Sequence, residues 1–415
     1  STLSSSSAAS DVYKRQDKNR IIFGGNSTEH EVSIVSALQA AEFFDKTKYD
    51  IVPIYITKDN RFFVSEFTGK IEEYKNIKSL LEKSNQVLLV KNGKKVDLIK
   101  YPFKFLGNKI YDYIDIAFPI VHGTNVEDGT LQGMLNMLGI PYVGCDVYSS
   151  AVGMDKYAMK CILKENNIPV LDCLVVNKFK YLENSAEVKN EIKSKFNYPV
   201  IVKPFNLGSS VGIRIAKDDY SLEDALDYAF GFSYKLIVEP AITSIKEVNC
   251  SVLGDIESAV ASECEQPIGS GEILSYQDKY ESSSGKKTGS SNAKGTMESL
   301  SRKLPADIDE TTRKTIRNMA VDTFKTLGCN GVARIDFIID EKENKIYVNE
   351  INTIPGSLSF YLWKAVGMDY PDLLEKLIQL AIKRAREQED IIFSFDSNIL
   401  SLVNLGGSKN GGKIG

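Results

Sequence analysis

Two carboxylates and a carboxamide, Asp336, Glu350 and Asn352, occur in two short apolar runs near the C-terminal end of the chain. The runs are IDFII at 335–339 and KIYVNEIN at 345–352, and the residues between them are polar and mostly charged. Each run alternates apolar and polar residues in the manner of a half-buried strand. The pattern therefore predicts a β-hairpin.

Side chains on a strand alternate between its two faces. Arg334 and Asp336 should therefore project from one face, with Glu350 and Asn352 projecting together from the neighbouring strand. Hard cations such as Mg²⁺ are bound by carboxylate and amide oxygens, usually with substrate phosphates completing the coordination. The hairpin is a candidate metal site. The alternative, that these are solvated polar residues on an exposed sheet face, is the commoner situation for an arbitrary hairpin.

The residues that follow the second run favour the metal site. The sequence NTIPG at 352–356 has the form NxxPG, which directly after an acidic strand resembles the metal-binding strand of ATP-grasp ligases. The resemblance implies ATP and Mg²⁺ (or Mn²⁺) as cofactors, with two ions expected. It also implies that the metal ligands are Asp336, Glu350 and Asn352.

The composition is that of an ordinary globular protein. The 415 residues suffice for two to four domains, and 43% of them are hydrophobic and 26% charged. No run approaches the roughly 18 apolar residues that cross a bilayer, so no membrane partner is expected. Lys+Arg 51 against Asp+Glu 55 gives a net charge of −4, without the basic stripe of a nucleic-acid binder. We therefore expect small-molecule partners and no nucleic acid.

Cysteine usage bears on the compartment. The six cysteines form no CxxC pair and no His/Cys cluster, so zinc-binding and redox-motif interpretations are weak. A cytoplasmic location, which is reducing, fits this usage best.

The beginning of the chain indicates an α/β domain. From Arg20 it reads as a strand, a glycine-rich loop, a helix and a second strand, the start of a βαβ unit. A Rossmann cofactor site is the obvious alternative, but the GxGxxG spacing is absent. The loop GGNSTEHEVS at 24–33 instead resembles the first loop of D-alanine–D-alanine ligases. HGTNVEDGTLQGMLNMLGIPYVG at 122–144 closely resembles the corresponding loop and helix of that family.

The resemblance spans about residues 20–390, with the motifs in the family's order. It implies an α/β, three-domain ATP-grasp ligase with an N-terminal pre-ATP-grasp (Rossmann-like) domain and two α+β domains clasping ATP, and a homodimer. The expected domains are 17–144, 145–242 and 243–394. Residues 1–16 are expected to be a disordered leader that arose in sequence assembly, and 395–415 a flexible tail.

Two lysines and a Gly/Ser loop indicate phosphate binding. Lys156 lies in the first turn of an expected helix, and Lys203 precedes the loop at 208–212. Backbone amides in such a loop can close over phosphates, and lysines supply positive charge, although a Gly/Ser loop alone is more often a plain turn. Preceded by VIVKP, this one resembles the phosphate-covering loop of ATP-grasp enzymes. The resemblance places Lys156 and Lys203 at the nucleotide, together with Glu239 and Glu247, although both glutamates could be surface acids.

Residues 273–304 are polar and rich in Ser, Gly and Lys. By composition alone a disordered linker is the favoured interpretation. The DKY sequence at the start of the segment, however, resembles the mobile loop that closes over ATP and substrate in D-alanine–D-alanine ligases. This resemblance implies a lid in which Lys279 contacts the nucleotide and Tyr280 the substrate.

The implied function is ATP-dependent ligation of two D-alanines to D-alanyl-D-alanine through an acyl phosphate, for peptidoglycan precursor synthesis. Glu31 would hold the ammonium of the first D-alanine, although a first-turn acid more often only complements the helix dipole. A lone histidine is likewise usually structural. The catalytic residues implied by the resemblance are Glu31, Ser209, Tyr280, Arg334 and Gly356, and the further substrate-binding residues are His122, Ser210, Ser359 and Tyr361.

One position departs from the family pattern. Tyr361 stands where the family commonly has a small hydroxyl residue that grips the acceptor carboxylate. Its phenol can still donate a hydrogen bond, but the pocket would change in size, so D-serine remains open as the acceptor. Tyr280 favours an amine acceptor over D-lactate. Another ATP-grasp carboxylate–amine ligase and a non-catalytic nucleotide-binding module are the remaining alternatives.

Overall fold

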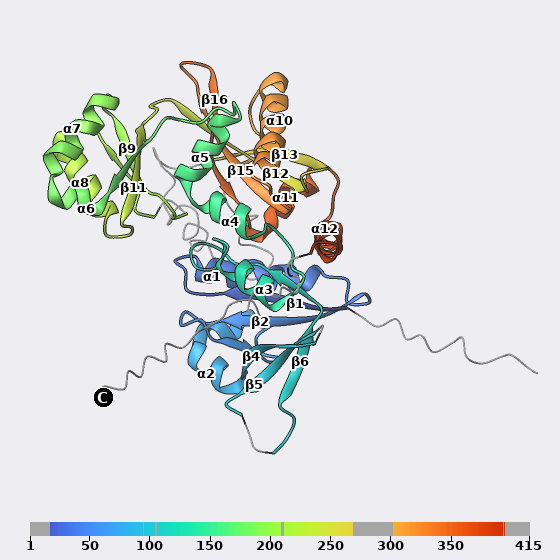
Figure 1. The fold of residues 1–415 in the computed structure, drawn as a ribbon. Helices are drawn as coiled ribbons and strands as arrows, with labels where there is room; N and C mark the ends of the chain where they lie inside the picture. The colour runs from blue at the N-terminus through green and yellow to red at the C-terminus, as the bar shows by residue number, and fades with distance from the viewer. Residues whose placement is uncertain are drawn as a thin grey trace, which may run out of the picture.

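The computed structural model describes residues 17–93, 95–103, 106–208, 211–268, 302–392 and 394. These residues form three β-sheets, each packed against helices (Figure 1). Four of the predicted site residues lie outside the described residues, as do the leader, the tail beyond 394 and residues 273–301 of the expected lid. Those four are Ser209, Ser210, Lys279 and Tyr280.

The N-terminal sheet has seven strands in the order β6-β5-β4-β3-β2-β1-β7. The predicted βαβ start is confirmed, because β1 (Asp17–Gly24) and β2 (Tyr49–Ile56) are parallel and joined by α1 (His30–Phe43). β7 (Ile116–Pro119) is parallel to β1 on its other side, so the loops after β1 and β7 leave the sheet at the same edge. The remaining elements are β3 (Phe62–Val64), η1 (Ile71–Asn76), α2 (Ile77–Lys83), β4 (Asn85–Asn92), β5 (Lys95–Tyr101), β6 (Ile110–Ile114) and α3 (Thr130–Leu138).

Two short helices lead from this sheet to the central domain, and local sequence fixes where they begin. α4 (Val147–Met154) begins after Asp146, which forms a capping box with Ser149. α5 (Lys156–Glu165) begins after Asp155, whose carboxylate accepts hydrogen bonds from two backbone N–H groups of the first turn. Such caps stabilise a helix start by about 1 kcal/mol. The cap at Asp155 therefore holds Lys156 in the first turn of α5.

The central sheet has the order β10-β9-β11-β8, and its described pairings are antiparallel. Helices cover one face of it, at the left of Figure 1. The elements are β8 (Leu174–Asn177), α6 (Lys178–Glu183), α7 (Ser185–Lys195), β9 (Val200–Pro204), β10 (Arg214–Ala216), α8 (Asp219–Ala229) and β11 (Lys235–Pro240).

The C-terminal sheet has the order β14-β13-β12-β15-β16, and α10 (Glu310–Thr326) packs on it. The predicted hairpin is confirmed as β15 (Gly331–Asp340) and β16 (Lys345–Asn352). β14 (Arg302–Lys303) falls inside the range expected for the lid, but it is a strand paired with the end of β13. The other elements are β12 (Ile245–Gly254), β13 (Ala259–Pro267), η3 (Gly356–Ser359), α11 (Phe360–Lys364) and α12 (Tyr370–Glu389).

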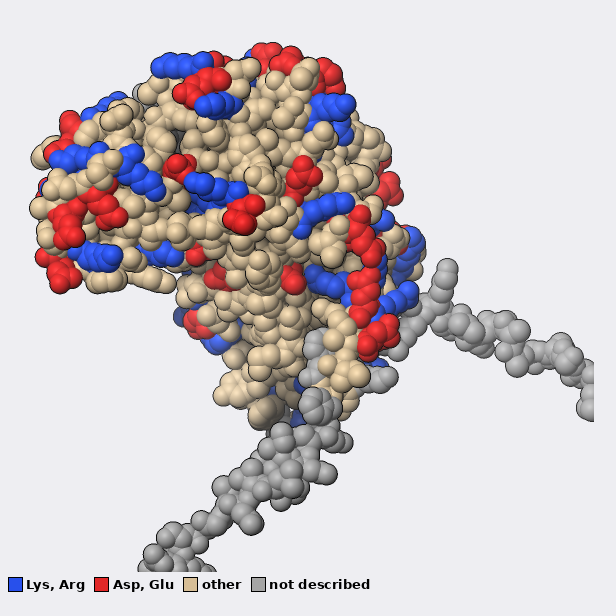
Figure 2. Space-filling model, turned by 45° about the horizontal axis from the view of Figure 1, so that its top comes forward, with Lys and Arg blue, Asp and Glu red and all other residues tan. Residues whose placement is uncertain are grey.

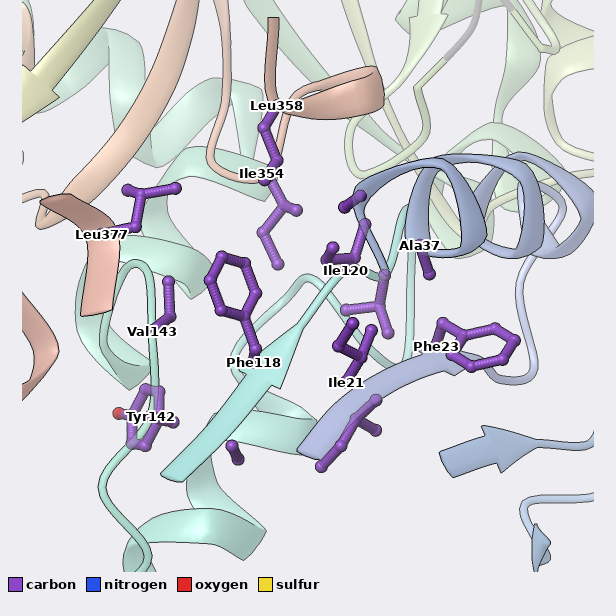
Figure 3. Packing of buried hydrophobic residues seen from close by; sticks show 14 of the residues in the cluster. Ile21, Phe23, Ala37, Phe118, Ile120, Tyr142, Val143, Ile354, Leu358 and Leu377 are labelled. Carbon is purple, nitrogen blue, oxygen red and sulfur yellow. The ribbon is translucent and has the colours of Figure 1, made fainter. Parts of the chain in front are cut away.

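The segment after β16 joins the C-terminal domain to the N-terminal sheet. Figure 3 shows Ile354, Leu358 and Leu377 in one apolar cluster with Phe118 and Val143. Burial of an aliphatic side chain stabilises the fold by about 1.5–3 kcal/mol. These contacts therefore hold the end of the hairpin against the loops of the N-terminal sheet.

The surface gives two further observations. No helix in the described ranges is long and apolar enough to cross a membrane. On the face drawn in Figure 2, Lys and Arg side chains are interspersed with Asp and Glu side chains. The charge on that face is therefore mixed rather than of one sign.

Candidate active site

The hairpin aligns the candidate metal ligands. Asp336 is the cross-strand partner of Glu350, and Arg334 is that of Asn352. Directly opposed residues on paired strands point to the same face, so all four side chains lie together. The Asn352 amide donates a hydrogen bond to the Asp336 carboxylate at 3.1 Å.

Two cationic side chains contact these carboxylates. Arg334 donates two hydrogen bonds of 2.7 Å to Asp336, one from Nε and one from Nη2. Lys156 Nζ lies 3.2 Å from Glu350 Oε2. Because Lys156 belongs to α5, the structure brings the first turn of that helix next to the hairpin.

The donor set fits a divalent ion. Within the described ranges no group of three or more His, Cys, Asp or Glu side chains could hold a metal. The hairpin instead offers two carboxylates and, as a third oxygen, the amide of Asn352. Mg²⁺ is usually bound by one or two carboxylates when substrate phosphates supply further oxygens, so Asp336, Glu350 and Asn352 suit an ion that arrives with a nucleotide.

A buried carboxylate lies between two lysines in the central domain. Glu239 on β11 is fully buried, and its oxygens lie 2.7 Å from Lys203 Nζ and 2.8 Å from Lys160 Nζ. Burial would raise the pKa of Glu239, but the two lysines lower it to about 2. The carboxylate predicted to contact the nucleotide is therefore the shared counterion of two buried lysines.

The two predicted lysines also connect the domains. Lys203 donates a hydrogen bond to the Asn349 amide oxygen on β16 at 3.2 Å, beside Glu350. Lys156 donates to the Leu207 carbonyl at 2.8 Å, at the start of the Gly/Ser loop. The structure therefore gathers both lysines, the beginning of that loop and the hairpin into one region.

Glu247 lies on the same sheet face as the hairpin cluster. It is partly buried on β12 opposite Ile338 of β15. Two residues further along β12, Asn249 is the partner of Asp336. Because alternate residues of a strand share a face, Glu247 points to the side of the sheet that carries Asp336.

His122 contacts the loop that follows the hairpin. It is 4% exposed, and its Nδ1 lies 2.8 Å from the Ile354 carbonyl oxygen. A carbonyl only accepts hydrogen bonds, so Nδ1 carries the proton and donates it. Nε2 lies 3.1 Å from the Ser36 hydroxyl. Burial lowers the pKa of His122 to about 4, so the ring is neutral at pH 7.

The two acids of the first loop have different surroundings. The Glu31 side chain is 63% exposed and pairs with Lys58 Nζ at 2.7 Å. Glu29 is 8% exposed, and its Oε2 lies about 3 Å from the positions that a Cβ would occupy at Gly123 and Gly208. The fold therefore directs Glu29 between the His122 loop and the Gly/Ser loop, and leaves Glu31 at the surface.

The turn after Gly356 is buried and has an unusual backbone. Ser357, Leu358 and Ser359 have φ of 48°, 54° and 51°, a left-handed conformation that non-glycine residues rarely adopt. The Ser359 hydroxyl is buried and has no hydrogen-bond partner among the described residues. Tyr361 is also buried, and its phenol donates a hydrogen bond to Glu265 at 2.9 Å.

The chain resembles proteins of a known family over most of its length. A family model described as the D-ala D-ala ligase N-terminus matches residues 18–145, and one described as the D-ala D-ala ligase C-terminus matches 162–379. A D-alanine–D-alanine ligase of Thermosipho africanus is 40% identical over 92% of this chain and 98% of its own length. The chain belongs to the D-ala D-ala ligase family.

Solved structures of the family give the same result. The D-alanine–D-alanine ligase of Coxiella burnetii has a TM-score of 0.74 and 30% identity, covering 90% of this chain and 96% of its own. The VanG D-Ala:D-Ser ligase of Enterococcus faecalis has a TM-score of 0.71 and 32% identity, covering 88% and 100%. The predicted ATP-grasp fold, with an N-terminal domain and two further domains, is confirmed.

Three buried residues that the sequence did not single out lie beside the predicted site residues or their loops. They are Glu29, Lys160 and Glu127. Lys160 could have been found from its spacing, because it lies four residues after Lys156 and residues at this spacing share a helix face. Glu127 accepts hydrogen bonds from the backbone N–H groups of Gly123 and Ile354, both at 2.9 Å. Burial and the nearby Glu29 raise its pKa to about 8. No pattern in the sequence distinguished Glu29 from Glu31.

Proposed function

We propose that this chain is an ATP-dependent D-alanine–D-alanine ligase that forms D-alanyl-D-alanine through an acyl phosphate, for peptidoglycan precursor synthesis. Family membership supports the reaction. One observation carries the assignment of the site: Asp336 and Glu350 are cross-strand partners on the hairpin. Lys156 contacts Glu350, and Lys203 contacts Asn349, the residue before it.

The first step activates the donor. An oxygen of the first D-alanine's carboxylate attacks the γ-phosphorus of ATP, and ADP leaves. Phosphoryl transfer of this kind depends on positioning and on neutralising the spread negative charge. Lys156 and Lys203 supply positive charge, and Glu247 together with Lys279 is proposed to contact the nucleotide. Glu239 acts behind Lys203 and holds that lysine in place.

The metal assignment rests on the hairpin oxygens. Asp336, Glu350 and Asn352 would hold Mg²⁺ (or Mn²⁺), with two ions proposed, and the ions would supply charge next to the transferring phosphoryl group. Arg334 and Lys156 hold the same carboxylates in the orientation described here.

The second step forms the peptide bond. The amine of the acceptor attacks the acyl carbonyl, phosphate leaves, and the ammonium proton is lost to solvent. The tetrahedral oxyanion formed on the way needs fixed donors, and we assign Arg334 and the backbone N–H of Gly356 to it. The buried Ser359 hydroxyl is proposed to contact the acceptor.

The donor ammonium needs a carboxylate, and the structure favours Glu29 over Glu31 for this role. Glu29 is buried between the His122 and Gly208 loops, whereas Glu31 pairs with Lys58 at the surface. Ser209, Ser210 and Tyr280 are proposed to complete the donor subsite. His122, held against Ile354, is proposed to position the loop that follows the hairpin.

D-Serine is the second candidate acceptor. Tyr361 stands where the family commonly has a small hydroxyl residue, and its phenol is engaged by Glu265. The similar VanG protein is itself named a D-Ala:D-Ser ligase. A competition assay with equal D-alanine and D-serine, with the two dipeptides separated by chromatography, decides between the acceptors.

Phosphate release from ATP in the presence of D-alanine tests the function itself. We expect release that depends on D-alanine and a product that co-migrates with D-alanyl-D-alanine. Release only with other amino acids would instead support another carboxylate–amine ligase. Nucleotide binding without turnover would support a non-catalytic module.

The setting of the reaction is also proposed. Use of ATP and of free D-amino acids suits the cytoplasm. We propose a homodimer without nucleic-acid or membrane partners, and analytical ultracentrifugation of the full chain tests the assembly.

A further inference from the structure

Three polar side chains form a stripe along the buried face of helix α1: Ser33, Ser36 and Gln39. They are 0%, 1% and 5% exposed and lie among apolar core residues of the same helix. Residues three apart in sequence share one face of a helix. A buried polar group destabilises the fold unless it forms hydrogen bonds. The hydrogen-bond partners of the stripe therefore indicate its role.

The stripe binds segments that approach α1 from elsewhere in the chain. Ser33 Oγ accepts a hydrogen bond from the His122 backbone N–H at 3.0 Å. Ser36 Oγ accepts one from the Ser357 backbone N–H at 3.0 Å and lies 3.1 Å from His122 Nε2. Gln39 Oε1 accepts a hydrogen bond from the Ser357 hydroxyl at 2.6 Å. The stripe therefore connects the loop after β7 with the turn after the hairpin, which belongs to the C-terminal domain.

The direction of each hydrogen bond around Ser36 is fixed. His122 Nδ1 carries the proton, because it faces the Ile354 carbonyl, so Nε2 of the neutral ring only accepts. The Ser36 hydroxyl therefore donates its one hydrogen to Nε2 and accepts from the Ser357 N–H. Loss of this hydroxyl would take a partner from a buried ring nitrogen and from a buried backbone N–H at once.

The turn that the stripe holds is strained. Ser357, Leu358 and Ser359 have φ of 48°, 54° and 51°, and this left-handed conformation is unfavourable for residues other than glycine. Such a conformation persists only when surrounding contacts hold it. The N–H and the hydroxyl of Ser357 are both bound by α1. Helix α1 therefore holds the first residue of the strained turn.

These contacts bracket Gly356, whose backbone N–H is assigned above to the tetrahedral oxyanion. On one side, Ile354 donates its N–H to Glu127 at 2.9 Å, and its carbonyl accepts from His122 at 2.8 Å. On the other side, Ser357 is bound by the stripe. A donor that is already fixed stabilises a developing charge better than one that must reorient. The N-terminal domain therefore sets the position of a donor that belongs to the C-terminal domain.

We propose that Ser36 and Gln39 are positioning residues for peptide-bond formation, which hold the Gly356 N–H, through Ser357, where the tetrahedral oxyanion forms. This inference rests on the proposed ligase function. The oxyanion belongs to the second step and does not form during transfer of the γ-phosphoryl group. Loss of either residue should therefore slow peptide-bond formation and spare formation of the acyl phosphate.

The chain contains a matched control serine. Ser262 of β13 is fully buried, and its hydroxyl also accepts one hydrogen bond and donates another. It accepts from the Ser251 backbone N–H at 2.9 Å and donates to the Glu263 carbonyl at 2.8 Å. Ser262→Ala and Ser36→Ala therefore remove the same group from similarly buried positions. An effect of lost stability alone will appear in both variants.

The experiment compares two rates in the full-length enzyme with ATP and D-alanine. The first is formation of the dipeptide, followed by chromatography. The second is positional isotope exchange in ATP that carries ¹⁸O in the bridge between its β- and γ-phosphates. Reversal of acyl-phosphate formation can leave this oxygen in a non-bridging position of the β-phosphate. The ratio of exchange to dipeptide formation therefore reports on the second step relative to the first.

The two serine variants should behave differently. For Ser36→Ala we expect dipeptide formation at saturating substrate to fall about tenfold, as misplacement of a fixed donor predicts. The ratio of exchange to dipeptide formation should rise by about the same factor, while the KM of ATP changes less than about twofold. Ser262→Ala should lower the thermal midpoint and leave the rate and the ratio within about twofold of wild type.

Ser357→Ala provides a second measurement that leaves α1 unchanged. It removes the hydroxyl that Gln39 binds and keeps the backbone N–H that Ser36 binds. Because one of the two contacts remains, dipeptide formation should fall only roughly two- to fivefold, with a matching rise in the ratio.

The outcomes separate this proposal from the proposed function. If wild type forms the dipeptide but folded Ser36→Ala keeps the wild-type ratio of exchange to dipeptide formation, the assignment of Ser36 is wrong and the ligase function stands. Equal effects of Ser36→Ala and Ser262→Ala on both rates would overturn it as well. If Ser36→Ala does not fold, an unchanged ratio in Ser357→Ala overturns the proposal. If wild type shows no D-alanine-dependent phosphate release, the proposed function fails first and this assignment with it.

Discussion

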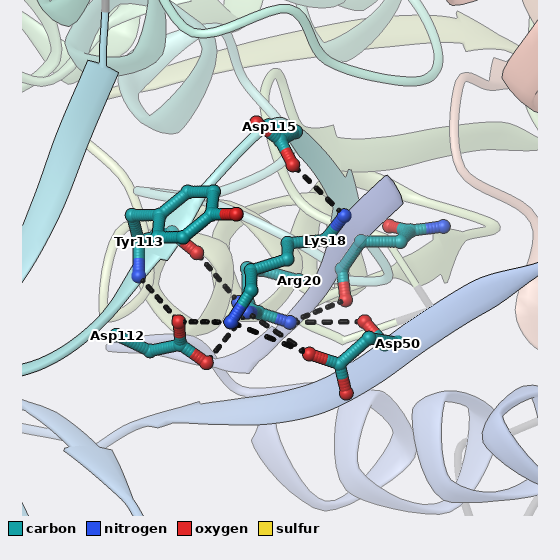
Figure 4. Close-up of polar contacts among 7 residues, drawn as sticks. Lys18, Arg20, Asp50, Asp112, Tyr113 and Asp115 are labelled. Carbon is teal, nitrogen blue, oxygen red and sulfur yellow. Dashed lines mark hydrogen bonds and ion pairs between the residues drawn. The ribbon is translucent and has the colours of Figure 1, made fainter. Parts of the chain in front are cut away.

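Two ionic clusters in this protein use the same chemistry in different ways. In the N-terminal sheet, the fully buried Arg20 donates to the Tyr113 carbonyl at 2.9 Å, the Asp50 carbonyl at 2.9 Å and the Asp112 carboxylate at 2.8 Å (Figure 4). Lys18, on the same strand, joins the cluster through Asp112 and, by its backbone N–H, through Asp115. Backbone carbonyls and charged side chains therefore fix this cluster together.

In the hairpin cluster, side chains hold the two carboxylates in the contacts given above. Asp336 is held by Arg334 and Asn352, and Glu350 by Lys156 from another segment of the chain. Side chains that hold one another can reorient when a ligand arrives, whereas backbone carbonyls keep the positions that their strands give them. From this difference we infer that the cluster around Arg20 serves stability and that the hairpin cluster is the one that a ligand can reach.

The largest effect should come from Glu350→Gln in the hairpin cluster. Loss of one carboxylate next to the transferring phosphoryl group should reduce kcat by at least about 100-fold, measured as phosphate release with D-alanine. Glu343→Gln, in the exposed turn of the same hairpin, is the control and should retain activity. Full activity of Glu350→Gln would remove this residue from the site. If Glu350→Gln lowered the free energy of unfolding but left kcat unchanged, the hairpin cluster would serve stability, as the Arg20 cluster does.

Arg20→Gln tests the other side of the comparison. Removing the buried cation leaves Asp112 with Lys18 as its partner and takes the Arg20 hydrogen bonds from the Tyr113 and Asp50 carbonyls. This change should lower the free energy of unfolding by about 3–5 kcal/mol in urea denaturation. Activity per folded molecule should change little. Arg61→Gln breaks an exposed pair with Asp59 and should cost no more than about 0.5–1 kcal/mol. A stable but inactive Arg20→Gln would show that this cluster also serves the site.

His122 links the N-terminal sheet to the loop after the hairpin, and acid should weaken this link. Its pKa is lowered from 6.5 to about 4, so the unfolded chain takes up the proton first. The stability that the neutral ring contributes is complete above pH 6.5 and is lost as the pH falls through 4. The loss reaches about 3 kcal/mol.

Urea denaturation from pH 7 to pH 4 measures this dependence. Burial also lowers the pKa of His30, so the slope of the wild type contains both residues. We expect His122→Asn to flatten the curve and His30→Asn to preserve the contribution of His122. An unchanged slope in His122→Asn would contradict the assignment.

The smallest expected effect is on the KM of the donor D-alanine, and it should distinguish the two acids of the first loop. Glu29→Gln should raise the KM of the donor D-alanine by about tenfold or more, because a buried charge partner of the ammonium is lost. Glu31→Gln breaks only an exposed pair. It should change the KM of the donor by less than about twofold and the free energy of unfolding by less than about 0.5 kcal/mol. The reverse result would return the ammonium site to Glu31.

Much of the site could be predicted because its residues lie in regular elements. Strand alternation placed Asp336, Glu350 and Asn352 on one face, and the register confirms this grouping. The sequence did not indicate which of Glu29 and Glu31 is buried, because both stand at the start of one helix. The burial of Glu29 depends on two distant loops, one at Gly123 of the same domain and one at Gly208 of the central domain. The partners of Glu239 were hidden for the same reason, since Lys160 and Lys203 reach it from different elements.

The sequence by itself determined the family, the fold class, the hairpin and the positions of Lys156 and Lys203, because these follow from periodicity and from motifs in a fixed order. Only the tertiary structure decided that Glu29 faces inward, that Glu239 is a counterion and that Tyr361 bonds to Glu265. The physical reason is that burial and charge pairing are properties of side chains from distant segments, and these meet only when the three sheets pack together.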